Sequence, residues 1–118
     1  MNSVLIAPLL ILILAIVYRI FPPKKINWFY GYRTKLSMKN LDTWHEANRF
    51  ASNLLLICSV AYLCFVMLCV LFIHDRERQM LISTIVLFFY LFGIVFITEW
   101  RLKKLFNESG KRIIENKK

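Results

Sequence analysis

The segment LDTWHEANR, residues 41–49, carries the side chains with the most chemistry in this chain. Asp42, His45 and Glu46 could transfer protons, and Asp42 could orient the imidazole, because a spacing of three brings side chains together on a helix. The letters HE also begin a zinc-protease helix, but that pattern needs a second histidine four residues after the first. Here that position is Arg49. We therefore expect no metal site, and we keep catalysis by these three groups as an alternative.

Hydroxyl groups near the histidine suggest a second kind of chemistry, that of an activated nucleophile. Thr34, Ser37 and Thr43 are all close to His45 in the sequence. Such groupings are common in polar segments, where hydroxyls cap helices and form turns. We expect that structural role here, and we expect no cofactor.

A helix must position these groups, and we expect it to begin at Asn40 or directly after it. Asn40 is a favoured N-cap, and Asp42 falls in the first turn, where the helix dipole favours an anion. Helical spacing then places Leu41, Trp44 and Asn48 on one face. An aromatic side chain and an amide on a shared face predict that this face packs against another part of the protein.

Arg33, Arg49 and Glu99 form a third candidate group. Glu99 directly follows an apolar run, and a carboxylate at a membrane boundary is costly unless it is paired. We expect Glu99 to pair with Arg33 or Arg49, with Arg33 preferred, and so to lock the polar segment to the last helix. Glu46 and Arg49 are also close enough along a helix to form an ion pair.

The elements around these groups are unusually apolar. The chain has 118 residues, of which 58% are hydrophobic, and its mean hydropathy is +0.55. A small soluble domain does not bury that much apolar surface. Residues 4–21, 54–73 and 80–98 form apolar runs close to the roughly 20 residues that a helix needs to cross a bilayer. We predict an all-α membrane protein, a bundle of three transmembrane helices.

The distribution of lysine and arginine predicts the orientation of the spans. None precedes the first run, seven lie from Arg19 to Arg49, two lie in the turn after the second run, and seven follow from Arg101 onward. By the positive-inside rule, the N-terminus lies outside and both strongly basic segments lie in the cytoplasm. The net charge of +9 then serves topology and contact with the lipid bilayer, and we expect no direct binding of nucleic acid.

The whole chain is expected to form one domain with two polar parts on its cytoplasmic side. Residues 22–53 form a polar cassette between the first two spans, and residues 99–118 form a tail. Leu102 and Phe106 recur at helical spacing after the third span, which predicts an amphipathic helical extension. Gly110 is expected to end that extension as its C-cap.

The cassette resembles the signature of the SdpI family of bacterial membrane proteins. In that family a G-[YF]-R-T segment is followed by Ser, then Asn, then Trp, then Ala-Asn. The matching residues here are Gly31, Tyr32, Arg33, Thr34, Ser37, Asn40, Trp44, Ala47 and Asn48. The tail is similar to the family's ending through Glu99, Phe106, Gly110, Lys111 and Arg112.

This resemblance implies a short, single-module protein of the bacterial inner membrane. The family takes its name from a longer immunity protein, which protects toxin-producing cells from their own secreted peptide and draws a transcriptional repressor to the membrane. The implied function is binding, in immunity, toxin resistance or signalling. The expected partners are a peptide toxin, a cytoplasmic regulator and further copies of this chain. The expected functional core is Arg33, Asn40, Trp44, Asn48 and Arg49, with Glu99 as partner.

Two other classes of function stay open beside binding. One is a membrane-embedded enzyme that acts at the cytoplasmic interface through His45, Asp42 or Glu46. The other is a small transporter or a transporter subunit. A chain this short would have to oligomerise to enclose a path, and its second and third apolar runs hold no charge to line one.

Overall fold

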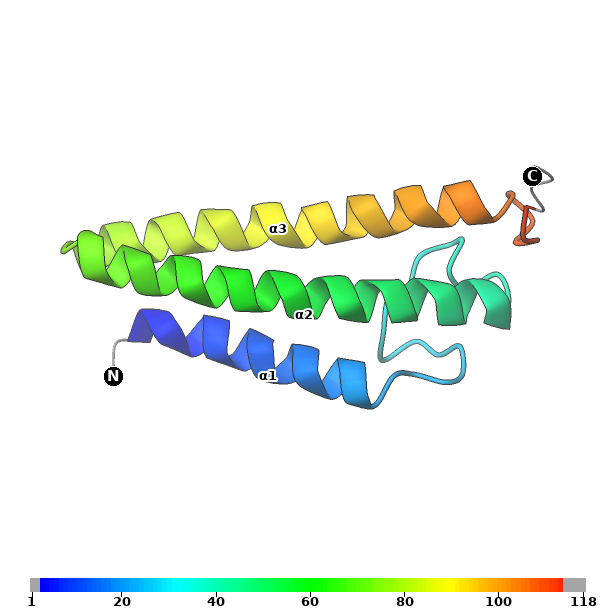
Figure 1. Ribbon diagram of the computed structural model, residues 1–118, viewed down its shortest axis with the longest axis horizontal. Helices are drawn as coiled ribbons and strands as arrows, with labels where there is room; N and C mark the ends of the chain where they lie inside the picture. Colours follow the sequence, from blue (N-terminus) through cyan, green and yellow to red (C-terminus); the bar gives the residue numbers. More distant parts are fainter. Residues whose placement is uncertain (1–2, 114–118) are drawn as a thin grey trace.

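The computed structural model describes residues 3–113, which form three long helices (Figure 1). A short 3-10 turn, η1 (Ser3–Leu5), leads into α1 (Ile6–Ile20). The second helix, α2, spans Leu41–Phe72, and the third, α3, spans Arg76–Leu105. The predicted all-α, three-helix architecture is confirmed.

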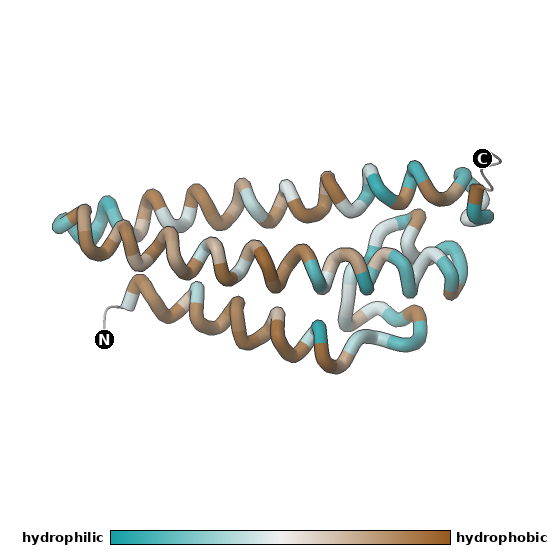
Figure 2. The backbone as a smooth tube through the Cα atoms, in the orientation of Figure 1, coloured by the Kyte–Doolittle hydropathy of each residue, from teal (hydrophilic) through white to brown (hydrophobic). Residues whose placement is uncertain are grey.

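All three helices are long and apolar enough to cross a membrane. Their middle parts are apolar, and polar residues gather at the two ends of the bundle (Figure 2). The helix α2 has 32 residues and is therefore about 48 Å long, which exceeds the roughly 30 Å of a hydrocarbon core. The first turns of α2 and the last turns of α3 lie together at the end that holds the polar cassette.

The central helix, α2, lies between α1 and α3 and packs against both (Figure 1). The core of the apolar part is thin. Tyr62 and Val66 of α2 pack there with Val4, and the Tyr62 hydroxyl donates to the carbonyl of Ser83 at 2.8 Å. Most other apolar side chains point outward, as expected for helices that lipid surrounds.

Local signals in the sequence set where α2 begins and where α3 begins. Asn40 and Thr43 form a capping box, with the Thr43 amide donating to Asn40 Oδ1 at 2.9 Å and the Asn40 amide donating to Thr43 Oγ1 at 3.1 Å. This confirms the predicted start of α2. Asp75 caps α3 by accepting from the Glu77 amide at 3.1 Å, so only Ile73–Asp75 joins the two helices.

Gly110 does not cap α3, contrary to the prediction. The helix ends at Leu105, with Phe106 as its C-cap, because the buried Phe106 ring turns the chain inward against Ala47 and Leu102. Residues 106–113 then form a C-terminal hook, closed by a bridge between Phe106 and Arg112. Gly110 completes the turn inside this hook and has a φ of +88°.

We expect Gly110→Ala to lower the free energy of unfolding by about 1–3 kcal/mol, because its φ disfavours a side chain. An added Cβ would also lie 2.8 Å from both Asn40 Nδ2 and Lys39 Cβ. Gly93→Ala is the matched control, since its Cβ would meet nothing within 4 Å. Thermal unfolding of both variants in detergent tests this; equal losses of stability would contradict the hook's packing on Asn40.

Candidate functional site

Part of the signature gathers around the side chain of Asn48, which is only 1% exposed. Its Oδ1 accepts a hydrogen bond from the Tyr18 hydroxyl of α1 at 2.5 Å and another from the Tyr32 amide of the loop at 2.6 Å. Its Nδ2 donates to the carbonyl of Trp44 at 2.9 Å. One buried amide therefore joins α1, the loop and α2, and both of its polar atoms are satisfied.

Gly31 lets the loop come close enough to reach that amide. It has a φ of +106°, and an added Cβ would lie 2.6 Å from Asn48 Oδ1 and 2.7 Å from Pro23 Cγ. Any other residue would push the backbone away from Asn48. The Gly-Tyr pair of the signature is thus explained, since Tyr32 donates its amide from the position directly after the glycine.

Trp44 and His45 hold the segment that leaves α1. The Trp44 indole donates to the carbonyl of Pro23 at 2.8 Å, and Nε2 of His45 lies 2.9 Å from the carbonyl of Lys24. Trp44 is fully buried, so the prediction that its face is packed holds for Trp44 and Asn48. It is wrong for Leu41, which is 52% exposed because the loop covers α2 only beyond its first residue.

Glu99 of α3 receives the loop through hydroxyl groups. Its Oε1 lies 2.9 Å from the Tyr32 hydroxyl and 2.9 Å from Thr34 Oγ1. Burial, together with the hydrogen bond to Glu99, raises the pKa of Tyr32, so the phenol keeps the proton that it donates. A contact between the cassette and Glu99 is present, and it is made by neutral donors.

The structure does not pair Glu99 with either expected arginine. Within residues 3–113, Arg33 instead donates to the carbonyl of Trp28, and Arg49 Nη2 lies 2.7 Å from Glu46 Oε1. The reason is that successive side chains of the loop point in opposite directions. Tyr32 and Thr34 face α3, and Arg33 between them points to the exposed side.

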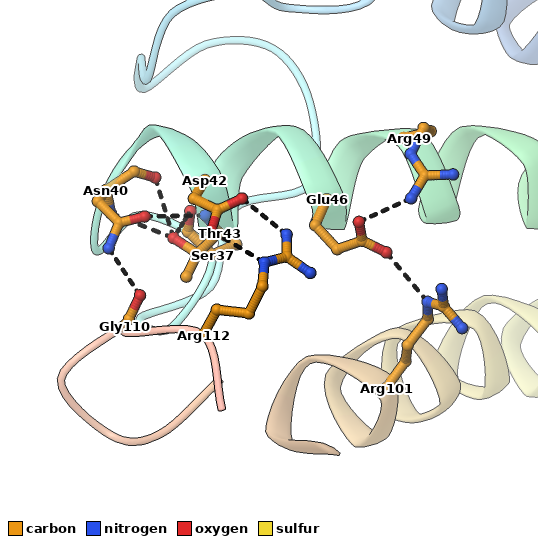
Figure 3. Close-up of polar contacts among 9 residues, drawn as sticks. All are labelled: Ser37, Asn40, Asp42, Thr43, Glu46, Arg49, Arg101, Gly110 and Arg112. Atoms are coloured by element: carbon orange, nitrogen blue, oxygen red, sulfur yellow. Dashed lines mark hydrogen bonds and ion pairs between the residues drawn. The ribbon is translucent and has the colours of Figure 1, made fainter. Parts of the chain in front are cut away.

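The three hydroxyl residues that could have supplied a nucleophile serve turns and caps. Thr34 and Ser37 bond to each other, with the Thr34 amide donating to Ser37 Oγ at 2.7 Å and the Ser37 amide to Thr34 Oγ1 at 3.2 Å. Thr43 Oγ1 lies 3.1 Å from the carbonyl of Ser37 and belongs to the capping box (Figure 3). These bonds support the structural role expected from the sequence.

Glu46 lies between two arginines at the junction of α2 and α3 (Figure 3). It is 7% exposed, and its Oε2 accepts from Arg101 Nε at 3.2 Å while Oε1 accepts from Arg49. Burial alone would raise the pKa of Glu46, but the hydrogen bonds from the two arginines outweigh it and lower the pKa. The predicted Glu46–Arg49 pair is confirmed.

The C-terminal hook is bonded to the start of α2 (Figure 3). Asn40 Nδ2 donates to the carbonyl of Gly110 at 2.8 Å, so this side chain caps α2 and holds the hook at once. The guanidinium of Arg112 spans both carboxylate oxygens of Asp42, at 3.2 and 2.7 Å, and lies 4.8 Å from the Phe106 ring centre. Hydrogen bonding to Arg112 lowers the pKa of Asp42.

The three candidate proton-transfer groups do not converge on one point. Asp42 faces Arg112, Glu46 faces two arginines, and His45 faces the Lys24 carbonyl. No group of metal-binding side chains occurs in the part of the chain that the structure describes. Asp42, Glu46 and His45 therefore each contact a different part of the protein, and these contacts hold the cassette in place.

Two residues of this site were not singled out from the sequence, Tyr18 and Arg101, and the partner of Arg112 was not predicted. Tyr18 could have been found, because it is the one polar side chain inside the first apolar run before Arg19. The partners of the two arginines lie far away in the sequence, so no local spacing indicates them.

Comparison with known proteins agrees with the resemblance in the cassette. Residues 24–98 match the model of the SdpI/YfhL protein family. The chain belongs to this family. Among its relatives is the "Uncharacterized protein YfhL" of Bacillus subtilis (strain 168), which is 34% identical over 101 residues, or 86% of each chain. No solved structure matches.

The family match includes Asn48 and the loop that it holds, but Tyr18 lies before it, and it ends directly before Glu99. The carboxylate that receives the loop, Arg101 and the hook thus lie outside the matched residues. The signature residues thus serve two attachments: Tyr32 is held to Asn48 of α2 through its amide, and Tyr32 and Thr34 reach Glu99 of α3 through their hydroxyls.

We expect Asn48→Ala to lower the free energy of unfolding by about 2–4 kcal/mol, because it leaves a buried amide and a buried hydroxyl without their acceptor. Asn53→Ala is the matched control on the same helix, since Asn53 makes one exposed bond to Arg19. Thermal unfolding in detergent measures both. Equal losses would show that Asn48 does not hold the loop.

The pair of arginines on Glu46 predicts a loss of stability in acid. The folded protein lowers the pKa of Glu46 below 4.5, so its contribution is complete above that value and is lost as the pH falls through the folded-state pKa. Denaturation curves should show stability falling as the pH drops below the ordinary pKa range of a glutamate, and Glu46→Gln should flatten that fall. Glu77→Gln, exposed at the other end of the bundle, should leave it unchanged. An unaltered curve for Glu46→Gln would contradict the assignment.

Proposed function

We propose that this multi-pass membrane protein is an immunity-type member of the SdpI/YfhL family that gives a bacterial cell resistance to a membrane-active peptide by binding it. The observation that carries the proposal is the match to the family signature, together with the hydrogen bonds that the signature residues make. They form a closed network around Asn48 that shapes the bundle. A preformed binding surface needs such rigidity, because binding then costs less ordering of the protein.

Binding is favoured over catalysis by the surroundings of the polar side chains. Asp42 and Glu46 are neutralised by arginines, and His45 lies against a backbone carbonyl. A general acid or base must lie within hydrogen-bond reach of the reacting atom of a substrate. Groups that act together must also reach the same substrate. These three groups point to three separate partners.

A groove at the cassette end supports a role in signalling to a cytoplasmic regulator. It has a volume of about 880 Å³ and lies between the loop, α3 and the hook. Its rim carries Lys35, Lys39 and Lys103, and Leu36 and Phe106 form part of its floor. Glu99 also lines it, so a partner in the groove would touch the residue that receives the loop.

The proposed orientation puts this groove in the cytoplasm of a bacterium. The cassette and the end of α3 carry most of the lysines and arginines, whereas the turn Ile73–Asp75 and its neighbours carry few. The positive-inside rule then places the N-terminus and that turn outside the inner membrane. A secreted peptide would meet the turn and the lipid-facing helices first.

A survival assay tests this function. A toxin-sensitive bacterium without SdpI-family genes would express the chain and be exposed to the peptide toxin that the named family member neutralises. We expect the lethal dose to rise severalfold over an empty vector, with retention of membrane potential. Asn48→Ala should lose this protection, because it frees the loop. No protection by wild-type protein that is present in the membrane would refute immunity.

The same assay separates binding from chemistry. His45→Ala, at normal abundance and with unchanged thermal stability, should keep its protection, because the imidazole only contacts the Lys24 carbonyl. If His45→Ala abolished protection under those conditions, the enzyme alternative would replace the binding proposal.

A further inference from the structure

A second pocket lies on the α1 side of the cassette, where the end of α1 meets α2. It has a volume of about 290 Å³, the space of roughly ten water molecules. Arg19 and residues 22–24 form one wall, and residues of α2 from His45 to Ser52 form the other. Among residues 3–113, no acidic side chain lines it.

Three cations line this pocket, and their charge is largely unbalanced. Arg19 Nε donates to Asn53 Oδ1 at 2.5 Å, which fixes the guanidinium but adds no negative charge. The Lys24 ammonium has no hydrogen bond or ion pair within residues 3–113. Arg49 shares the single carboxylate of Glu46 with Arg101. Three basic residues therefore line the pocket, with part of one carboxylate to balance their charge.

The surroundings of the pocket are apolar on the membrane side. Val17 and Ile20, in the last turn of α1, and Phe21, directly after it, are exposed next to Arg19. Trp28 and Phe29 of the following loop are also exposed, which is typical of rings at a membrane interface. A bound anion would thus have acyl chains or hydrocarbon beside it.

We propose that this pocket binds the phosphate of an anionic phospholipid headgroup, with Arg19, Lys24 and Arg49 contacting its oxygens and the acyl chains lying along α1. Arginine suits this task because its planar guanidinium can give a phosphate two parallel hydrogen bonds. Basic pockets between transmembrane helices at the cytoplasmic side are known to hold anionic headgroups. The inference does not depend on the immunity proposal, since lipid binding by the purified protein is measured without any toxin.

The protein, purified as the full chain in neutral detergent, can be titrated with phosphatidylglycerol and followed by native mass spectrometry. We expect phosphatidylglycerol to bind more tightly than zwitterionic phosphatidylcholine. Lys24→Gln should weaken phosphatidylglycerol binding about fivefold, the effect of one basic residue near an anionic lipid. Lys25→Gln is the matched control, because it removes the same charge one residue away from the pocket.

A second matched pair of variants replaces two arginines, each of which forms an ion pair with a carboxylate three residues earlier in the sequence. Arg49→Gln removes a pocket residue that pairs with Glu46, and Arg78→Gln removes one that pairs with Asp75 at the other end of the bundle. Only Arg49→Gln should weaken the lipid complex. Melting temperatures measured without lipid show that each variant is folded before the comparison.

Two results would overturn the proposal. Equal weakening by Lys24→Gln and Lys25→Gln would mean that lipid responds to diffuse surface charge and not to this pocket. Displacement of phosphatidylglycerol by an equal concentration of inorganic phosphate would mean that the pocket takes a free anion instead of a headgroup.

Discussion

The buried amide of Asn48 is the interaction on which the polar end of this protein depends. A buried amide is costly unless its oxygen and nitrogen are both bonded, so the groups around it cannot be placed independently. Tyr18 must come from α1, the loop must bring the Tyr32 amide, and Gly31 must leave room for both. Gly31, Tyr32 and Asn48 of the family signature meet this one requirement.

A second layer extends from that amide to α3. Tyr32 donates its amide to Asn48 and its hydroxyl to Glu99, so this residue links α2 to α3. Glu46 and Asn40 add two further contacts, to Arg101 and to the Gly110 carbonyl. The apolar part of the bundle has only a thin core around Tyr62 and Val66. The relative positions of the helices are therefore set mainly at the polar end.

Local patterns in the sequence predicted the parts of this structure that depend on neighbours along the chain. The start of α2 directly after its cap Asn40, the Glu46–Arg49 pair and the burial of Trp44 and Asn48 all follow from helical spacing and capping. Helical periodicity predicts which face of α2 is buried, but it does not predict which other segment packs against that face.

The predictions that failed concerned partners far away in the sequence. Charge alone suggested an arginine for Glu99, but the alternating directions of Tyr32, Arg33 and Thr34 present hydroxyls to α3 instead. Gly110 looked like a helix cap because nothing local shows that Phe106 is drawn into the core. Such contacts become visible only when the helices are placed side by side.

Amide hydrogen exchange, measured by NMR on the unmodified protein in a membrane mimetic, tests most directly whether Asn48 holds the loop. The Tyr32 amide, which donates to Asn48 Oδ1, and the Trp44 indole N–H, which donates to the Pro23 carbonyl, should both exchange very slowly. The indole N–H of the exposed Trp28 provides the fast reference in the same spectrum. Exchange at Tyr32 and Trp44 as fast as at Trp28 would contradict the account.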